Sequence, residues 1–349
     1  MFSSLTNSLR VTSLVLLPLM AVPFASIVNA QEEMEEKARM TITNLRDVDD
    51  DYGYMGEYHG VVASAQGNRN VGLQIVSLGD GEFRGMFYTG GLPGTGWNKT
   101  DREVLKGARS GDLLELEGET TRVEMVNSSP TIYDADGKIV GSLKKVKRVS
   151  PTMGMLAPAN ALTLFDGVHT NAFKNGKMTK DGLLKEGTEL LSTYRDFTLH
   201  AEFRLPYMPH ARGQGRSNSG FYLLSSYEVQ VLDSFGLEGI ENECGALYRY
   251  KRPDQNMCLP PLQWQTYDMT FRSPRFDVAG NKIQNARLTV LHNGVPVHSN
   301  FEVERKTGAG QKESSKPRPI KFQDHSNPVR FRNVWLIDLE NPIRYFAGY

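Results

Sequence analysis

Apolar and polar residues alternate along much of the chain with the spacing of half-buried strands. Residues 197–205 and 267–271 place an apolar side chain at every second position, and residues 329–337 do so except at Asn333. Because successive side chains of a strand point to opposite faces, this alternation predicts strands with one buried face. No run of apolar residues at helical spacing occurs after residue 58. The pattern therefore predicts an all-β protein.

Turn signals separate the predicted strands. Gly79-Asp80-Gly81 lies between two apolar runs, and Asp136-Gly137 separates two further short ones. Asn293-Gly294 interrupts the run from Arg287 to Val297. Such dipeptides favour the positive φ angles of tight hairpin turns, so we expect antiparallel strand pairs at all three places.

A segment of linker composition divides the β pattern into two regions. Residues 150–159 contain two prolines and one glycine and carry no charge, which is typical of a linker. We therefore predict a small β-rich domain over residues 58–149, a linker over 150–161 and a β-sandwich or jelly roll over 162–349. Residues 31–57, rich in Asp and Glu, are predicted to be a solvated, acidic leader, with at most a short helix.

The N-terminus has the pattern of a secretory signal. Arg10 precedes an apolar run from Val11 to Phe24, and Val28-Asn29-Ala30 ends in small or modest residues. This order predicts a signal peptide over residues 1–30 and a mature chain that starts near Gln31. An uncleaved anchor is the alternative, but two prolines interrupt the run, which is short for a membrane span. We expect an exported, periplasmic or extracellular protein without stable membrane insertion after cleavage.

Charge and cysteine content narrow the function classes. The 40 basic residues balance the 40 acidic ones, which argues against nucleic acid as a partner. The two cysteines, Cys244 and Cys258, flank a short loop. In an exported chain such a pair usually oxidises, so we predict a disulfide that contributes about 3 kcal/mol. Two reduced packing thiols are the alternative, and the evidence for zinc is weak because no pair of histidines lies nearby.

Short motifs in the second region occur in the order of one family. They are Leu164-Phe165-Asp166-Gly167, Asn218-Ser219-Gly220, Tyr227-Glu228-Val229-Gln230-Val231-Leu232-Asp233, Gly245-Ala246-Leu247-Tyr248, Gln323-Asp324-His325 and Pro328-Val329-Arg330-Phe331-Arg332-Asn333. Together they resemble the 3-keto-disaccharide hydrolase family over roughly residues 162–340. The resemblance implies a concanavalin-like jelly roll with a cleft on its concave sheet. The N-terminal β region resembles a module that precedes this domain in planctomycete-like proteins.

The resemblance also implies a substrate class, glycosides already oxidised at C3 of a hexose. A ketone at C3 acidifies the C2–H bond, because loss of that proton gives an enolate. The glycosidic oxygen on C1 can then leave by elimination, and water adds back to give the free keto-sugar. Such a site needs a base, a group that stabilises the enolate oxygen and an acid for the leaving group.

Three residues are candidates for the catalytic groups. Glu228 and Gln230 stand two apart on a predicted strand and share one face, which the resemblance makes the lining of the cleft. His325 lies in a predicted loop within the family motif, and an imidazole side chain can serve as a base or an acid. Asp233 lies at the end of the strand, where it could be a second acid, a metal ligand or only a turn-forming residue. Which of Glu228 and His325 is the base stays open.

Five residues are candidates for binding the sugar. Asn218 and Arg332 could bind hydroxyls or the ketone, but Arg332 could instead pair with a buried carboxylate and Asn218 could only shape a turn. Gln230 shares the face of Glu228. Tyr248 and Trp264 could stack on a sugar ring, although core aromatics are equally common.

The sequence leaves a cofactor and two other function classes open. A divalent metal on Glu228, Asp233 or His325 would polarise the ketone, but the spacing does not establish one. A jelly roll also serves as a glycan-binding module without turnover. An ordinary glycoside hydrolase would need two carboxylates across the sugar, and Glu228 with Asp233 is the nearest pair.

Overall fold

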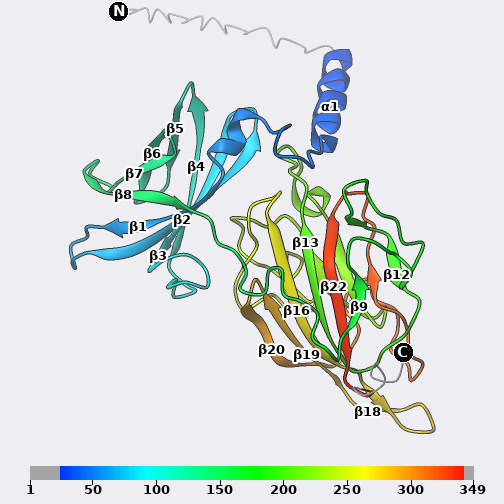
Figure 1. Cartoon of the computed structure of the whole chain (residues 1–349). Helices are drawn as coiled ribbons and strands as arrows, with labels where there is room; N and C mark the ends of the chain where they lie inside the picture. Colours follow the sequence, from blue (N-terminus) through cyan, green and yellow to red (C-terminus); the bar gives the residue numbers. More distant parts are fainter. Residues whose placement is uncertain (1–23, 342–349) are drawn as a thin grey trace, which may run out of the picture. The chain divides into compact units, whose positions relative to one another are not determined.

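The computed structural model describes residues 24–341, and strands account for nearly all of its regular structure (Figure 1). Residues up to Lys37 form one unit and residues from Ala38 onward form a second. The first unit contains most of helix α1 (Phe24–Arg39). The second contains a barrel followed by a two-sheet sandwich. This architecture confirms the prediction of a β-rich region followed by a C-terminal all-β sandwich.

The first β region is a closed barrel of eight antiparallel strands in chain order, and β1 closes it by pairing with β8. Its interior is filled by buried apolar side chains such as Leu73, Leu105 and Leu116. The strands are β1 (Gly56–Val62), β2 (Arg69–Gly79), β3 (Glu82–Thr89), β4 (Arg102–Ser110), β5 (Leu113–Glu117), β6 (Arg122–Val126), β7 (Ser129–Tyr133) and β8 (Ile139–Val146).

One sheet of the sandwich has five strands. Their spatial order is β10, β12, β21, β14 and β15, so strands made early and late in the chain lie side by side. The bounds are β10 (Phe173–Lys174), β12 (Thr188–Leu190), β14 (Ser219–Leu223), β15 (Tyr227–Val231) and β21 (Lys321–Phe322).

The opposite sheet has seven strands, and in Figure 1 the red β22 lies beside the green β13. The order is β11, β22, β13, β16, β19 and β20, with β9 also paired to β22. The bounds are β9 (Leu162–Phe165), β11 (Leu184–Lys185), β13 (Phe197–Arg204), β16 (Trp264–Arg272), β19 (Ala286–His292), β20 (Val295–Val303) and β22 (Arg330–Asp338). A separate hairpin joins β17 (Arg275–Phe276) to β18 (Lys282–Gln284).

Aromatic side chains from both sheets meet in the sandwich core. Phe221 of the five-stranded sheet packs against Tyr267 and Phe331 of the seven-stranded sheet, with ring centroids 5.8 and 5.5 Å apart. All three are fully buried, as the alternating pattern predicted for Tyr267 and Phe331. The core therefore fixes which face of each sheet points outward.

The predicted hairpin turns have the expected backbone. Asn293 and Gly294, between β19 and β20, have φ angles of 52° and 78°. Gly79, Asp80 and Gly81 between β2 and β3 also have positive φ, as does Gly137 between β7 and β8. Glycine, asparagine and aspartate tolerate this left-handed conformation better than other residues do.

The acidic segment before the barrel is partly folded, contrary to the prediction of a solvated leader. Residues Asp50–Gly53 form a short 3-10 helix, η1. The buried carboxylate of Asp51 accepts hydrogen bonds from Arg109 at 2.9 Å and from the Gly81 backbone N–H at 2.8 Å. The composition of the segment did not reveal this, because its partners come from later strands.

The predicted signal peptide falls mostly outside the described residues. Residues 1–23 are not described, and the predicted cleavage site after Ala30 falls within α1. Export therefore stays a prediction. Among residues 24–341, no helix is both long enough and apolar enough to cross a membrane.

The predicted disulfide is absent, because Cys244 and Cys258 are both free and buried. The Cys244 sulfur lies 3.2 Å from the Tyr267 hydroxyl, and the Cys258 thiol donates to the Leu232 carbonyl at 3.5 Å. Burial raises the pKa of the Cys258 thiol. Each sulfur therefore has a polar contact within the core. This arrangement agrees with the alternative prediction of two reduced packing thiols.

Candidate active site

The outward face of the five-stranded sheet carries the candidate site. On β15, Val229 points into the core while Glu228 points outward. Tyr222 of β14 lies directly opposite Glu228 in the antiparallel register, and Gly220 lies opposite Gln230. Side chains at directly paired positions lie on the same face, so Tyr222 and Glu228 are neighbours.

Glu228 is a buried carboxyl with an unused oxygen. The residue is only 2% exposed, and its Oε2 atom has no hydrogen-bond partner among the described residues. Burial raises the pKa of Glu228 to about 7, and a hydrogen bond from Tyr222 offsets part of that rise. A carboxyl group with this pKa takes up and gives off a proton near neutral pH.

Gly220 makes room for the carboxyl group. A Cβ atom at position 220 would lie 2.7 Å from Glu228 Oε1 and 3.3 Å from Gln323 Oε1. Any other residue would therefore displace Glu228. The Gln323 amide donates to the Tyr222 hydroxyl at 3.4 Å, while its buried Oε1 atom has no partner in the described part of the chain. Two acceptor oxygens near Gly220 thus lack donors, which is rare for buried groups.

Amide side chains surround the other side of Glu228. Asn218 donates to the Gln214 carbonyl at 2.8 Å. With its nitrogen turned toward Glu228, the Gln230 amide donates to Glu228 Oε1 at 3.3 Å and to the Ser219 carbonyl at 2.9 Å. The structure therefore brings three predicted residues, Glu228, Gln230 and Asn218, into one connected cluster.

Tyr248 and the polar loop at 304–318 border this cluster. The backbone N–H of Tyr248 donates to the Glu228 carbonyl at 3.1 Å, and its ring is half-buried. The Glu228 backbone N–H donates to the Thr307 hydroxyl at 2.8 Å, and Gly308 donates to the Tyr248 carbonyl at 2.9 Å. The loop is thus held against β15, as expected for a segment that borders the site.

A groove of about 440 Å³ runs along the same sheet. Tyr222 and Gln323 form part of its lining, so the groove includes two side chains of the Glu228 cluster. Near its other end Glu189 pairs with Lys174 at 3.2 Å and with Lys321 at 3.3 Å. The volume suits a small ligand. The remaining lining residues are Asn175, Gly187, Thr188, Ser225, Ala309, Gln311, Phe322 and Asp324.

His325 and Asp233 do not join this cluster. The side chain of His325 is exposed and makes no hydrogen bond with the described part of the chain, although its neighbour Asp324 lines the groove. Asp233 is buried and pairs with Arg216, whose Nε donates to it at 2.7 Å. The structure therefore does not bring either residue together with Glu228.

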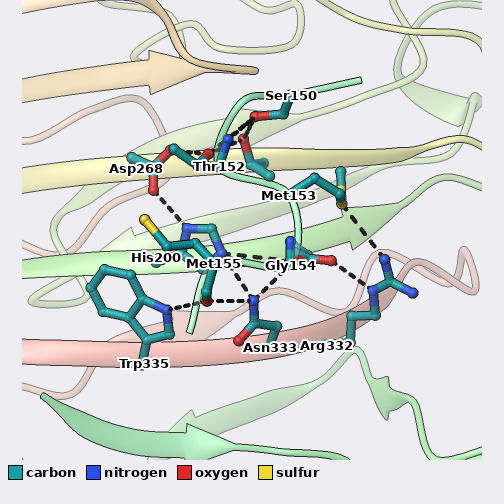
Figure 2. A network of polar contacts seen from close by, with 12 residues as sticks. Ser150, Thr152, Met153, Gly154, Met155, His200, Asp268, Arg332, Asn333 and Trp335 are labelled. Atoms are coloured by element: carbon teal, nitrogen blue, oxygen red, sulfur yellow. Dashed lines mark hydrogen bonds and ion pairs between the residues drawn. The ribbon is translucent and has the colours of Figure 1, made fainter. Parts of the chain in front are cut away.

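Trp264 and Arg332 lie on the outward face of the other sheet. The Arg332 guanidinium lies over the Trp264 ring, 4.0 Å from its centroid. Its Nε donates to Glu202 at 2.7 Å, and its terminal nitrogen lies near the Met153 sulfur (Figure 2). These two predicted sugar-binding residues therefore belong to a cluster separate from the groove.

That second cluster is a closed network. His200 lies 2.6 Å from the Asp268 carboxylate and stacks on the Trp335 ring. Glu202 accepts from the Gly154 backbone N–H at 2.6 Å, from Asn333 at 2.9 Å and from Arg332, and these donors together with His200 lower its pKa to about 2.

The segment predicted as a linker covers this network (Figure 2). The Thr152 hydroxyl donates to Asp268 at 2.7 Å, and the Ser150 hydroxyl lies 2.6 Å from that of Thr266. The Met155 carbonyl accepts from Asn333 and Trp335. Residues 150–155 are thus bound to the sheet rather than free, and the network holds them there.

Three residues of the site were missed by the sequence reasoning: Tyr222, Gln323 and Gln214. Tyr222 had a usable signal, since it stands two residues after Gly220 on a strand and so shares its outward face. Gln323 stands in the Gln323-Asp324-His325 motif, which was its signal. Gln214 lies in the short 3-10 helix η2 (Gly213–Gly215), where no periodicity predicts the direction of a side chain. Within residues 24–341, no group of three or more His, Cys, Asp and Glu side chains is placed to hold a metal ion.

The family model of the 3-keto-alpha-glucoside-1,2-lyase-like domain matches residues 160–337, just over half of the chain. The chain belongs to this family. Membership makes the second region a carbohydrate-active domain of the hydrolase kind. The matched range includes the Glu228 cluster and the groove, and it begins after the barrel. No curated protein matches the sequence significantly.

Solved structures show more distant likenesses. A candidate glycosyl hydrolase from Parabacteroides distasonis is 28% identical, with 53% of this chain and 86% of that chain covered and a TM-score of 0.49. A second from the same organism is 18% identical, with 51% and 94% covered and a TM-score of 0.36. A Trypanosoma rangeli sialidase is 9% identical, with 81% and 51% covered and a TM-score of 0.30. These likenesses are too distant to add to the assignment of the family.

Proposed function

We propose that the chain cleaves 3-keto-glycosides and that Glu228 removes the proton from C2. The observation that supports this most is the buried Glu228 carboxyl, whose pKa of about 7 and unpartnered oxygen suit a base. A base is most effective when its pKa lies near the working pH. The family match supplies the sugar class.

The proposed reaction begins with a proton transfer. The Glu228 carboxylate takes the C2 proton, and the electron pair of that bond passes into the C3 ketone to form an enolate. The pair then returns to make a C1–C2 double bond while the C1–O bond breaks and the leaving oxygen takes a proton. Water adds to C1 of the enone, and a proton returns to C2. The sum of these steps is hydrolysis, and no oxidant or reductant is consumed.

Tyr222 and Gln323 are placed to assist that transfer. The Tyr222 hydroxyl contacts Glu228 and lines the groove, so it is our candidate donor for the enolate or the leaving oxygen. The unpartnered oxygens of Gln323 and Glu228 can accept hydrogen bonds from sugar hydroxyls. Burial raises the pKa of Tyr222, so its hydroxyl keeps its proton at neutral pH and remains a donor.

One assay tests the proposal directly. The protein is incubated with a 3-keto-disaccharide and, in parallel, with the same disaccharide before oxidation, and release of the monosaccharides is followed. We expect cleavage of the oxidised sugar alone, because only a ketone at C3 makes the C2 proton acidic. Equal cleavage of both sugars, or binding of the oxidised sugar without any turnover, would show that the proposed chemistry is wrong.

An ordinary two-carboxylate mechanism finds less support. Asp233, the nearest predicted partner of Glu228, is engaged with Arg216 and lines a different cavity. A glycan-binding module without turnover would not need a carboxyl group whose pKa lies near neutrality.

We also propose that the protein is exported, because residues 1–30 have the pattern of a secretory signal peptide. N-terminal sequencing of the protein from its native host is the measurement. A chain that begins near Gln31 supports export, and an intact Met1 contradicts cleavage.

A further inference from the structure

A second cavity, of about 500 Å³, lies where the barrel meets the sandwich. It shares no lining residue with the groove beside Glu228. Its apolar wall comes from both parts: Val76, Leu78 and Phe83 belong to the β2–β3 hairpin, whereas Phe235 and Leu237 follow β15. The barrel thus supplies half of a cavity whose other half belongs to the carbohydrate-active domain.

Direct contacts hold the two walls together. The Tyr207 hydroxyl donates to the Ser77 hydroxyl at 2.9 Å, and the Arg212 guanidinium donates to the Leu78 carbonyl at 2.7 Å. Val76 belongs to the same buried apolar cluster as Phe235. Because these contacts tie the rim of the cavity on two sides, the cavity is a built feature of the junction and not a gap between loose parts.

The cavity holds more positive than negative charge. Arg84, Lys106, Arg212 and Arg216 line it, against Glu82 and Asp233. Asp233 is already neutralised by Arg216 at 2.7 Å, and the Arg212 guanidinium donates only to neutral carbonyls. Arg84 Nε makes no hydrogen bond with the described residues, although the Arg84 charge acts on the nearby Glu243 carboxyl. Lys106 is exposed.

Two guanidinium nitrogens at the cavity lack partners. Arg84 Nε and Arg216 Nη2 are buried and make no hydrogen bond with the described residues. Arg216 as a whole is 5% exposed. Leaving the donor of a buried charged group unpaired is costly, so a bound acceptor at this place would recover hydrogen bonds that the protein alone does not make.

We infer that this cavity binds a small amphipathic anion. Its apolar body would pack against Val76, Phe83 and Phe235, and its carboxylate, sulfate or phosphate group would lie by Arg84 and Lys106. A sugar fits this wall poorly, because its hydroxyls would lose water without finding acceptors or donors there. A purely apolar ligand would leave the cations without a bound anion, so both halves of the ligand are required.

The site gives the barrel a role that the family match does not cover. The match begins at residue 160, whereas Arg84, Lys106 and most of the apolar wall lie on β2, β3 and β4. The inference is independent of the proposed cleavage of 3-keto-glycosides, and its test uses binding and no activity.

Two matched fluorescent probes test the inference on the full chain. 1-Anilinonaphthalene-8-sulfonate carries an apolar ring system and a sulfonate, and N-phenyl-1-naphthylamine has nearly the same rings without the charge. We expect saturable binding of the anionic probe at one site per chain and weaker binding of the neutral one. Absence of saturable binding, or equal affinity for both probes, overturns the proposal.

Charge variants locate the site. The double variant Arg84→Gln with Lys106→Gln removes both cations and should weaken the anionic probe about tenfold or more, because charge-assisted hydrogen bonds are the strong ones. The neutral probe should change little. The control pair Lys138→Gln with Lys144→Gln removes two exposed charges from other places on the barrel. Equal loss in the control pair would mean that net charge alone attracts the probe.

A filling variant separates binding in the cavity from binding elsewhere. Ala108 is exposed and lines the cavity from β4, so Ala108→Trp puts a large side chain into the space without replacing a core residue. We expect both probes to lose this site while the thermal unfolding midpoint stays close to that of the parent. Undiminished binding of the anionic probe to a folded Ala108→Trp protein would place its site outside the cavity and refute the inference.

Discussion

The two outer faces of the sandwich each bury a glutamate, and the two carboxyl groups behave in opposite ways. Glu228, on the five-stranded sheet, has an oxygen without a partner and a pKa raised to about 7. Glu202, on the seven-stranded sheet, accepts hydrogen bonds from Gly154, Asn333 and Arg332, and its pKa is lowered to about 2.

Burial is similar for the two residues, at 2% and 0% exposed, so burial alone does not decide their chemistry. Hydrogen bonds and nearby charges that favour the ionised form outweigh desolvation at Glu202, and their near absence lets desolvation prevail at Glu228. The carboxylate of Glu202 is therefore fully engaged in holding residues 150–155, whereas one oxygen of Glu228 has no partner among the described residues. This difference is the reason for proposing Glu228, and not Glu202, as the catalytic base.

The largest expected effect is the loss of activity in Glu228→Gln. The substitution keeps the shape and removes the group that takes up the proton. Cleavage of a 3-keto-disaccharide should fall by about 10²-fold or more, the usual contribution of a positioned base. The measurement is kcat and KM for the oxidised sugar. The matched control is Glu202→Gln, for which kcat at 25 °C should stay within about twofold of the parent, and the comparison fails if the two variants lose activity equally.

The second effect is the loss of stability in Glu202→Gln. The amide nitrogen would face the Arg332 donor in place of an acceptor oxygen and leave that guanidinium without its carboxylate. The Arg332 side chain is 39% exposed and water can solvate it, so we expect a cost of about 1–3 kcal/mol, less than for a fully buried pair. Urea unfolding at pH 7 should show a lower midpoint for this variant. A midpoint equal to that of the parent would mean that the network does not hold the segment.

The third effect is the pH dependence of stability, which should have opposite signs at the two residues. The folded pKa of Glu228 lies above that of an unfolded glutamate. The contribution of Glu228 to stability is therefore present below about pH 4.5 and is lost as the pH rises through about 7. A shift of this size corresponds to about 3 kcal/mol. Glu228→Gln removes that loss, so the variant should gain stability over the parent between pH 5 and pH 8.

Glu202 gives the mirror image of that profile. The folded pKa of Glu202 lies below the unfolded value. The contribution of Glu202 to stability is therefore present above about pH 4.5 and is lost as the pH falls toward about 2. Thermal unfolding of both variants and the parent from pH 3 to pH 8 measures the two trends. Parallel curves for Glu228→Gln and the parent would argue against the raised pKa.

The smallest expected effect concerns the two aromatic residues that the sequence suggested for sugar stacking. Trp264 lies against Arg332 on the sheet opposite to the groove, so Trp264→Phe should leave KM unchanged within about twofold. Tyr248 borders the Glu228 cluster, and Tyr248→Ala should raise KM several-fold if its ring contacts the sugar, since aromatic contacts are typically worth about 1 kcal/mol. A larger change in KM for Trp264→Phe would reverse this assignment.

The sequence predicted the strands well because alternation reports directly on burial. Tyr267 and Phe331 lie in the core, and Glu228 and Gln230 share the outward face that their spacing implied. The outward direction of a side chain does not reveal which of two sheets holds its strand. For that reason Arg332 was grouped with Glu228, although β22 and β15 belong to different sheets.

Partners in loops were beyond prediction for a related reason. Residues 150–155 have the composition of a linker, and nothing local indicates that Gly154 donates to Glu202, 48 residues away along the chain. The same holds for Asp51, whose partner Arg109 lies in a later strand. The composition of a segment indicates how well water solvates it. Whether the segment binds to the rest of the protein depends on residues that are distant in the sequence and close in the fold.

The strand order also determines when each sheet can be completed during synthesis of the chain. Each barrel strand pairs with its neighbour in sequence, apart from β1 with β8, so the barrel has all its strands once Val146 has been made. The five-stranded sheet waits much longer, because β21 inserts between β12 and β14 and leads into Gln323. Nearly a hundred further residues must therefore be synthesised after Glu228 before its neighbour Gln323 is made. The five-stranded sheet is therefore completed late on the ribosome, and shortened chains that end before β21 contain all strands of the barrel but lack one strand of that sheet.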